Sequence, residues 1–381
     1  MPTRAIIIGG GIGGLAAGIA LRRAGLDVAV FERAPELREV GAGLTLWTNA
    51  IKALRQLGVG QTVEALAAPL AETEVRTWAG KVVISSNLAD LTSKLGAPTV
   101  GIHRADLQSA LAAALPSGVL RLGMTCERFD HDADGVAVQF GNAREDRGDL
   151  LIGADGIQST VRGQLLNDGA PRYAGYTAWR GVAHIDDPAV PVGKTLLCVG
   201  RGSQVGMLPI GRGRVYWFAT ANVPAGGVDP PGGRKSALME RFGDWYAPVP
   251  AFIDATDEAA IIRNDIVDRP PVHKWGDGRV TLLGDAAHPT TPNLGQGACQ
   301  AIEDAVVLGK ALRDADDPVA ALRAYEDLRR ERTALVTTRS RQLGKVLAWE
   351  GRFANWFRDT AMRRSQGLMA KQTAKLVGVE V

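Results

Sequence analysis

The sequence contains few cysteines, and their spacing excludes two common kinds of site. Its 381 residues include only Cys126, Cys198 and Cys299, with no CxxC pair. A zinc site or a redox dithiol requires closely spaced cysteines, so neither is indicated. We therefore expect no bound metal and a reduced, cytoplasmic setting.

Long hydrophobic runs and strong charge are also missing. The apolar stretch from Ala5 to Ile8 is followed by five glycines between Gly9 and Gly14, so it is too short for a secretion signal or a membrane span. The net charge is only +3, and no segment resembles a nucleic-acid-binding module. A small molecule is therefore a better candidate partner than nucleic acid.

Glycine, in contrast, is abundant, and three glycines near the N-terminus form a nucleotide-binding motif. The segment reads as a strand (RAIII), a turn (GGGIGG), a helix and a second strand that ends at Glu32. Gly9, Gly11 and Gly14 match GxGxxG, which lets a pyrophosphate approach a helix start, and the Glu32 carboxylate can hold ribose hydroxyls. This motif leaves NAD and FAD open.

A second motif follows a hydrophobic strand predicted at Asp149 to Ile152. The segment GADGIQSTVR, from Gly153 to Arg162, places Asp155 between two glycines at the end of this strand. Taken alone, Asp155 is equally well explained as a cap of the helix that follows. The motif gains a functional meaning only together with the third one.

The third motif, GDAAHPTTPNLGQG from Gly284 to Gly297, favours a flavin. A predicted strand, RVTLL, ends just before Asp285, and a proline-containing loop leads into a helix that begins at Gln296. The acid can accept hydrogen bonds from ribityl hydroxyls, while the free N–H groups and positive dipole of the helix start suit an electron-rich ring. The nucleotide signal at the N-terminus thereby becomes a flavin signal.

Taken in order, the three motifs resemble the fingerprints of the single-component FAD-dependent aromatic hydroxylases, the p-hydroxybenzoate hydroxylase fold group. The resemblance covers residues 1 to about 340. The segments RYAGYTAWRG and GQGACQAIEDAVVLG are similar to a branch with zeaxanthin epoxidases, FAD-dependent urate hydroxylases and salicylate-type hydroxylases. Cys299 fits this branch as a subgroup marker rather than as a nucleophile.

The resemblance implies an α/β fold in which two domains alternate along the chain. A Rossmann-type FAD-binding domain would comprise residues 1–71, 99–175 and 269–340, and an inserted β-sheet substrate domain residues 72–98 and 176–268. Alternating patterns such as QVGMLPI and RVYWFATANV agree with the inserted sheet. A helical segment, residues 341–381, would close the chain.

The family's cofactor contacts can be carried over to this chain residue by residue. They imply tightly but non-covalently bound FAD, held by Gly9, Gly11, Gly14, Glu32, Arg33, Arg104, Gln108, Asp155, Asp285, Gly295, Gln296 and Gly297. The last three residues would present N–H groups to the pyrimidine edge of the flavin, where the reduced ring carries negative charge.

The resemblance further implies a monooxygenase that consumes NAD(P)H. NADPH or NADH would reduce FAD, and O2 would then form a flavin C4a-hydroperoxide that hydroxylates an aromatic or heteroaromatic small molecule. The chain has no second GxGxxG, as expected for a family without a separate nicotinamide domain. Two alternatives stay open: an epoxidase of a lipophilic alkene and a non-catalytic FAD-binding redox sensor.

Candidate catalytic and substrate-binding residues also follow from the resemblance. Tyr216 matches the active-site tyrosine of urate-oxidising relatives, and Pro292 would lie near the reactive face of the flavin. The remaining expected pocket residues are Trp47, Arg180, Gln204 and Met207. An ordinary ion pair is an open alternative for Arg180. Gln204 stands where urate enzymes carry a cation, so urate is disfavoured, and His288 is expected to be structural.

The C-terminal segment is basic and contains aromatic residues. Its last 41 residues hold eight Lys or Arg against three Asp or Glu, together with Trp349, Phe353, Trp356 and Phe357. We expect a closing helix packed on the FAD domain with its basic face in water, and contact with an anionic membrane is the alternative. Monomer and homodimer are both compatible with the sequence.

Overall fold

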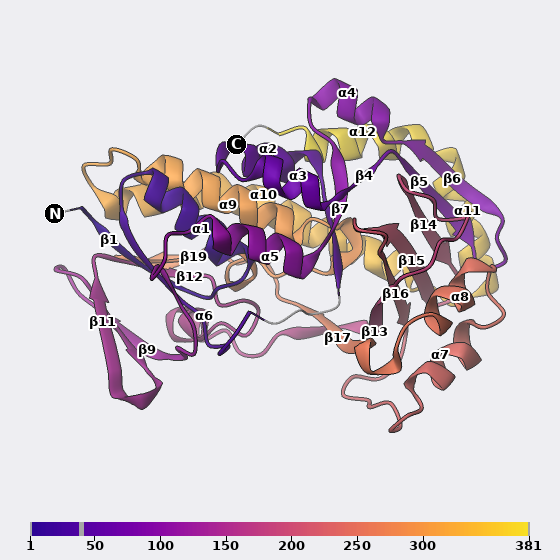
Figure 1. The fold of residues 1–381 in the computed structure, drawn as a ribbon, viewed down its shortest axis with the longest axis horizontal. Coiled ribbons are helices and arrows are strands. Elements are labelled where there is room, and N and C mark those ends of the chain that lie inside the picture. The colour runs from indigo at the N-terminus through magenta and orange to yellow at the C-terminus, as the bar shows by residue number, and fades with distance from the viewer. Residues whose placement is uncertain (1, 38–41, 380–381) are drawn as a thin grey trace.

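The computed structural model, which describes residues 2–37 and 42–379, contains two large β-sheets, seen at the left and right of Figure 1. The first has the order β18-β19-β12-β1-β2-β8. Its strands are β1 (Arg4–Ile8), β2 (Asp27–Phe31), β8 (Leu120–Arg121), β12 (Leu150–Gly153), β18 (Gly276–Asp277) and β19 (Val280–Leu282). All neighbours pair in parallel except β18 with β19.

This parallel arrangement brings the three sequence motifs to one edge. Ile8 is in register with Phe31 and Gly153, and Gly153 is in register with Leu282. Each of the segments GGGIGG, GADG and GDAAH begins within two residues of one of these strand ends. The carboxyl edge of a doubly wound parallel sheet is where such folds bind their ligands.

Helices surround the first sheet and the space between the sheets. They are α1 (Ile12–Arg23), α2 (Thr48–Gln56), α3 (Gly60–Leu66), α4 (Ala89–Leu95), α5 (Arg104–Ala113), α6 (Thr160–Leu166), α9 (Gly297–Leu312) and α10 (Pro318–Leu347), with short 3-10 turns η1 (Gly141–Ala143), η3 (Gly284–Ala286) and η4 (Pro292–Leu294).

Helices α1 and α9 pack closely and run in the same direction. A Cβ added to Gly13 would lie 3.2 Å from the Ala301 Cβ, and one added to Gly309 would lie 2.9 Å from the Ala20 Cβ. Residue numbers rise together along both helices, so the helices are parallel. Glycine permits this approach because it has no side chain. Both helix N-termini therefore open on the same side of the molecule.

Helix α10 connects the two halves of the molecule. Asp317 accepts hydrogen bonds from the backbone N–H of Val319 at 2.9 Å and Ala320 at 3.1 Å, so it caps the helix locally. Farther along, the Tyr325 hydroxyl donates to the Leu282 carbonyl of the first sheet. At its end, Leu347 packs among residues of the second sheet.

The second sheet has the order β17-β13-β16-β15-β14-β5-β6. Its strands are β5 (Glu72–Thr77), β6 (Val82–Asn87), β13 (Arg172–Ala183), β14 (Lys194–Val199), β15 (Ser203–Pro209), β16 (Val215–Ala221) and β17 (Ile262–Asp268). One face packs around buried Trp217 under α7 (Arg234–Phe242) and α8 (Pro248–Asp254), with η2 (Glu258–Ala260) nearby in the chain. The other face is left for the site described below.

Two small sheets complete the fold. The first has the order β3-β7-β4, with β3 (Gly43–Leu46), β4 (Ala68–Leu70) and β7 (Thr99–His103), and the second contains β9 (Cys126–His131), β10 (Val136–Phe140) and β11 (Arg144–Gly148). A Cβ added to Gly43 would lie 2.5 Å from the Tyr216 Cβ. Strand β3 therefore lies directly on the open face of the second large sheet.

The C-terminal helices, α11 (Arg352–Arg364) and α12 (Gln366–Val377), correct one expectation. We expected them to pack on the FAD domain, and the end of α12 does contact it, since Arg332 donates to the Leu376 carbonyl at 3.0 Å. Met362 and Met369, however, pack with Val75, Val83 and Ile84 of the second sheet. These side chains of β5 and β6 are buried and form the apolar surface that the helices cover. Within the described residues, none of the helices combines the length and apolarity that a membrane span requires.

Candidate active site

Two helix N-termini form the centre of the site. Gly11 is the N-cap of α1 and Gln296 the N-cap of α9, and neither helix receives a side-chain capping bond within the described residues. The first backbone N–H groups of each helix lack partners inside the helix and carry its partial positive charge. An anionic or electron-rich ligand that spans both termini would satisfy these groups.

The glycines of the first motif have two different roles. A Cβ on Gly9 would lie 2.3 Å from the Ala154 oxygen, and one on Gly14 would lie 1.9 Å from the Gly9 oxygen. These two glycines therefore close the turn. A Cβ on Gly11 would meet no described atom within 4 Å, so this position faces open space. Gly11 is the place where a pyrophosphate could approach the backbone.

Glu32 and Gln108 hold this turn from two sides. The Glu32 carboxylate accepts hydrogen bonds from the N–H of Gly10 at 2.6 Å and Ala34 at 2.9 Å. The Gln108 amide donates to the Gly10 carbonyl at 2.8 Å. Each Glu32 oxygen keeps a second lone pair for a hydroxyl group. Arg33, the next residue, is exposed and can approach a bound adenosine.

The second motif is tied to the third by an arginine that sequence reasoning missed. The Asp155 carboxylate accepts from the Ser159 hydroxyl and the Thr160 N–H, so it caps α6, and its cofactor role stays a prediction. On the same helix, buried Arg162 donates to the carbonyls of Ala286 at 2.9 Å and Ala287 at 2.8 Å. The position of this arginine on the first helical turn after GADG could have indicated the contact from the sequence.

Asp285 lies in a concave part of the protein surface. Its side chain is exposed to solvent, yet burial by surrounding atoms raises its pKa, while the charges of His288 and Arg104 oppose that effect. A side chain that is both accessible and surrounded by protein lines a recess. The exposed Arg104 at the start of α5 faces this recess closely enough to act on Asp285.

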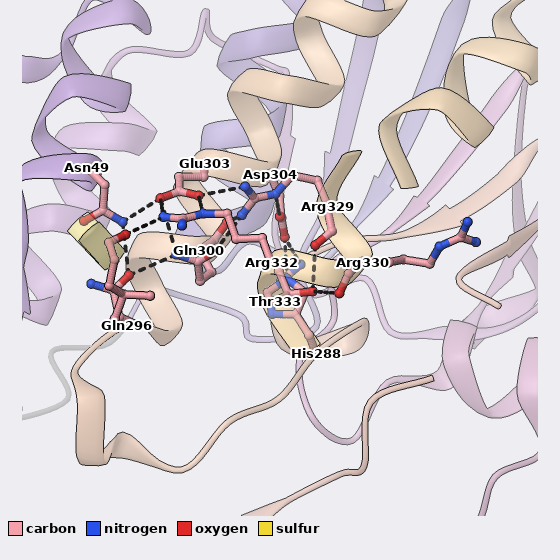
Figure 2. Close-up of polar contacts among 12 residues, drawn as sticks. Asn49, His288, Gln296, Gln300, Glu303, Asp304, Arg329, Arg330, Arg332 and Thr333 are labelled. Carbon is pink, nitrogen blue, oxygen red and sulfur yellow. Dashed lines mark hydrogen bonds and ion pairs between the residues drawn. The ribbon is translucent and has the colours of Figure 1, made fainter. Parts of the chain in front are cut away.

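Unpaired buried donors mark the start of α9. The Gln296 Oε1 accepts from Asn49 Nδ2 at 3.0 Å and Gln300 Nε2 at 2.9 Å, which leaves Gln296 Nε2 without a partner in the described structure (Figure 2). The buried Trp47 Nε1 likewise has none, and it would lie 3.2 Å from a Cβ on Gly295. Buried donors without acceptors are unfavourable, so this edge fits a ligand rich in acceptors.

Behind Gln296 lies a buried charge network that was not foreseen (Figure 2). Glu303 accepts from Asn49 at 2.6 Å, from Arg329 at 2.7 Å and from Arg332 at 2.7 Å. The charges and hydrogen bonds of these arginines outweigh burial and lower the pKa of Glu303. The network joins α2, α9 and α10 and holds the Gln296 amide in one orientation.

Cys299 is not a nucleophile in this environment. Its Sγ lies 3.6 Å from the Gly295 oxygen and 3.8 Å from the Thr45 oxygen, and its side chain is fully buried. Burial raises the pKa of the thiol to about 12, so the thiol stays protonated at neutral pH. The residue packs the start of α9.

The open face of the second sheet carries most of the expected pocket residues. Cross-strand pairing sets Tyr216 beside Val182 and Leu208, and sets Phe218 beside Arg180. Burial raises the pKa of Tyr216, and its hydroxyl has no hydrogen-bond partner in the part of the chain that the structure covers. Apolar neighbours complete this wall: Ala42, Trp47, Leu70, Leu88, Val182, Leu208, Ile210 and Phe218.

Arg180 stands out on this face because its charge is not paired with any residue that the structure describes. Its side chain is half-buried, and no ion pair or hydrogen bond to it occurs among residues 2–37 and 42–379. Its charge acts on the hydroxyls of Tyr176 and Tyr216. The alternative of an ordinary ion pair therefore finds no support in the described residues.

Two other expectations for the pocket have different outcomes. Gln204 lies on the open face, where it lines a small cavity with Tyr176 and Thr220. Met207 does not, since it pairs with Trp217 and is buried on the opposite face under α7 and α8. The expectation for Met207 is corrected by the alternation of a strand, which turns residues an odd number apart to opposite faces.

The loop before α9 reaches the same region. The Tyr176 hydroxyl donates to Asn293 Oδ1 at 2.8 Å, and this bond joins β13 to the loop. Pro292 begins η4 beside Asn293 and is exposed. The site fits a flavin dinucleotide that crosses from the first sheet toward the second. Four features support this fit: the open space at Gly11, the uncapped N-termini of α1 and α9, the recess at Asp285 and the unpaired donors near Gln296.

Comparisons with known proteins agree with this site. A family profile described as "FAD binding domain" matches residues 2–340. The chain is 45% identical over 358 residues to the aurachin C monooxygenase/isomerase of Stigmatella aurantiaca, covering 94% of this chain and 93% of that protein. It is 38% identical over 341 residues to the FAD-dependent urate hydroxylase of Klebsiella pneumoniae, with 89% of each covered.

A solved structure matches the whole fold. The crystal structure of Klebsiella pneumoniae HpxO complexed with FAD and uric acid has a TM-score of 0.94 and 34% identity, over 98% of this chain and 96% of that chain. The expected fold group and the expected FAD are thereby confirmed. The chain belongs to the FAD-binding domain family and is an FAD-dependent monooxygenase with the p-hydroxybenzoate hydroxylase-like fold.

Proposed function

We propose that this protein uses NADH or NADPH and O2 to hydroxylate an aromatic or heteroaromatic small molecule. The observation that carries the proposal is that Tyr216 and Arg180, whose guanidinium has no partner among the described residues, lie on the same apolar sheet face. This face lies against β3 and the α9 start, where the flavin ring is expected. The aurachin C and urate enzymes named above support oxygenation as the reaction type.

Bound FAD supplies the oxygen-transfer chemistry once a nicotinamide has reduced it and O2 has reacted. The residues that would hold it come from the three motifs and from their surroundings. They are Gly9, Gly11, Gly14, Glu32, Arg33, Arg104, Gln108, Asp155, Asp285, Gly295, Gln296 and Gly297. The uncapped N-terminus of α9 contributes a positive potential at the ring edge, which favours negative charge there.

The chain's own residues would bind and orient the substrate. Because burial raises the pKa of Tyr216, its hydroxyl is protonated at neutral pH and serves better as a hydrogen-bonding group than as a base. The Arg180 guanidinium can pair with an acidic or phenolic oxygen. The same wall excludes water through the side chains of Leu70, Leu88 and Leu208. Exclusion of water limits side reactions with solvent.

The chemistry of the wall narrows the substrate class. Neutral Gln204 replaces the cation expected in a urate enzyme, so urate stays disfavoured. The wall around Tyr216 is dominated by aliphatic side chains, which favours a ring that carries an apolar substituent. The same apolar wall favours epoxidation of a lipophilic alkene as a second candidate reaction.

A substrate panel tests these proposals. Purified protein loaded with FAD is given NADH or NADPH with phenols, N-heteroaromatic acids and terpenoid alkenes, while nicotinamide oxidation and incorporation of 18O from labelled O2 are followed. We expect oxygen incorporation into an aromatic member. Incorporation only into alkenes would replace the first proposal by the second. Absence of stimulated oxidation with every member would instead favour a redox sensor.

A further inference from the structure

Helix α11 presents a row of aromatic side chains to solvent. Phe353, Trp356 and Phe357 are 76%, 61% and 53% exposed. Their spacing of three and four residues places them on one side of the helix, and the rings of Phe353 and Trp356 lie 5.7 Å apart. Of the four exposed Phe and Trp side chains in the described residues, three therefore belong to this helix.

The opposite side of α11 is firmly attached to the protein. Buried Asn355 donates to the carbonyls of Trp349 at 2.9 Å and Gly351 at 2.8 Å. Buried Arg358 donates to the Gly200 carbonyl at 3.0 Å. These bonds determine which side of the helix faces inward. The aromatic row cannot turn into the core without breaking them, so it is a fixed feature of the surface.

Positive charge surrounds the aromatic row. Helices α11 and α12 together contain six Lys or Arg and one Asp, and Asp359 accepts from buried Arg358. Five excess positive charges on two helices exceed the net charge of +3 of the whole chain, so the remainder of the chain is slightly negative. The exposed cations are Arg352, Arg363, Arg364, Lys371 and Lys375.

We propose that α11 is a docking surface for an anionic lipid bilayer. Aromatic rings on one side of a helix insert at the level of the lipid headgroups, while neighbouring cations attract anionic lipids. Monomeric proteins seldom leave such a concentrated apolar row in water. Helix α11 lies along β6 at the right edge of the molecule (Figure 1), so docking brings the substrate sheet to the lipid surface.

Vesicle binding of the FAD-loaded protein tests this proposal. Cosedimentation is measured with phosphatidylcholine vesicles that contain either no phosphatidylserine or a substantial fraction of it. We expect binding to the anionic vesicles that weakens with added salt, because salt screens the cations. Equal binding to both vesicle types, or no binding to the anionic ones, would overturn the proposal.

Two variants locate the contact. Replacing Phe353, Trp356 and Phe357 by Ser should weaken vesicle binding by at least about tenfold, because each ring loses its burial in the lipid interface. R363E with R364E should weaken it by a similar factor and reduce the salt dependence. The matched control replaces Leu328 and Leu335, which are exposed on α10, by Ser and should bind like the wild type.

Folding and self-association are measured on the same samples. All variants should keep the wild-type FAD content and unfolding temperature, since the replaced side chains are exposed. Size-exclusion chromatography with light scattering addresses the competing explanation. If the wild type forms a dimer that the aromatic variant loses, while vesicle binding is absent, the surface belongs to a second copy of this chain and the lipid proposal fails.

Discussion

The imidazole Nε2 of His288 lies 2.6 Å from the Oδ2 of Asp304, and both side chains are buried. The other Asp304 oxygen accepts from Arg329 Nε at 2.6 Å (Figure 2). Since Oδ2 also accepts from the Gly284 N–H at 3.0 Å, three groups hold this carboxylate. His288 thus connects the third motif to α9 and α10, in agreement with a structural role. The charge of His288 also acts on Asp285, where it opposes the rise in pKa that burial causes.

Asp304→Asn should destabilise the protein and change its response to acid. Despite burial, the charges of His288 and Arg329 lower the pKa of Asp304 to about 2. A lowered folded-state pKa means that the stabilisation is complete above about pH 4 and is lost as the pH falls toward 2. We expect the variant to lose about 3–5 kcal/mol at pH 7, because a buried charge partner is removed.

Urea unfolding at several pH values checks this expectation. The wild type should lose stability more steeply than the variant between about pH 4 and 2, since about 2 kcal/mol of its stability depends on ionised Asp304. Parallel curves would show that Asp304 does not carry this pH dependence. The exposed Asp277→Asn is the control and should behave like the wild type.

Gly11→Ala and Gly14→Ala should separate ligand binding from folding. A Cβ at Gly11 meets open space, so the ligand-free fold should change by less than about 1 kcal/mol while FAD affinity falls. A Cβ at Gly14 would overlap the Gly9 oxygen, and this variant should lose about 1–3 kcal/mol. Thermal unfolding and FAD titration measure the two effects. Full FAD affinity in Gly11→Ala would place the pyrophosphate elsewhere.

Asp285→Ala should yield protein with little bound flavin. Loss of hydrogen bonds to a charged acceptor should weaken FAD binding by about 10- to 100-fold, whereas the stability of the ligand-free protein should not fall. The ratio of flavin to protein absorbance and isothermal titration calorimetry measure this. If the variant retained one FAD per protein molecule, Asp285 would not belong to the cofactor site.

Tyr216→Phe should uncouple the reaction without harming the fold. The Tyr216 hydroxyl has no partner in the described residues, so its removal should change stability by less than about 1 kcal/mol. FAD reduction should continue, while product per nicotinamide consumed falls by about 2- to 10-fold as substrate orientation is lost. Unchanged coupling would leave Tyr216 as a packing residue.

Arg180→Met should weaken the binding of acidic substrates more than the binding of neutral ones. An unpaired, half-buried guanidinium contributes nothing to stability through an ion pair, so the variant should be at least as stable as the wild type. KM for an acidic aromatic substrate should rise by about 10- to 100-fold, and KM for a neutral analogue should change little. Arg241→Met, on the exposed side of α7, is the control. Equal effects on both substrates would contradict an anchoring role.

Much of the cofactor region could be predicted because its signals are local. The turn at Gly9 to Gly14 and β2, which ends at Phe31 just before Glu32, depend on neighbours within a few residues. The substrate side was predicted less well. Gln204 and Met207 are three residues apart on one strand, and only the register of β15 with β16 shows that they face opposite sides.

By itself, the sequence determined the fold group, the flavin motif and the order in which the cofactor segments occur. The tertiary structure decided which distant residues meet. Asn49, Glu303 and Arg329 form one network, Arg180 has no partner among the described residues, and α11 turns its aromatic row outward. These outcomes depend on packing between elements far apart in the chain, whereas a glycine turn or a helix cap depends on the adjacent backbone.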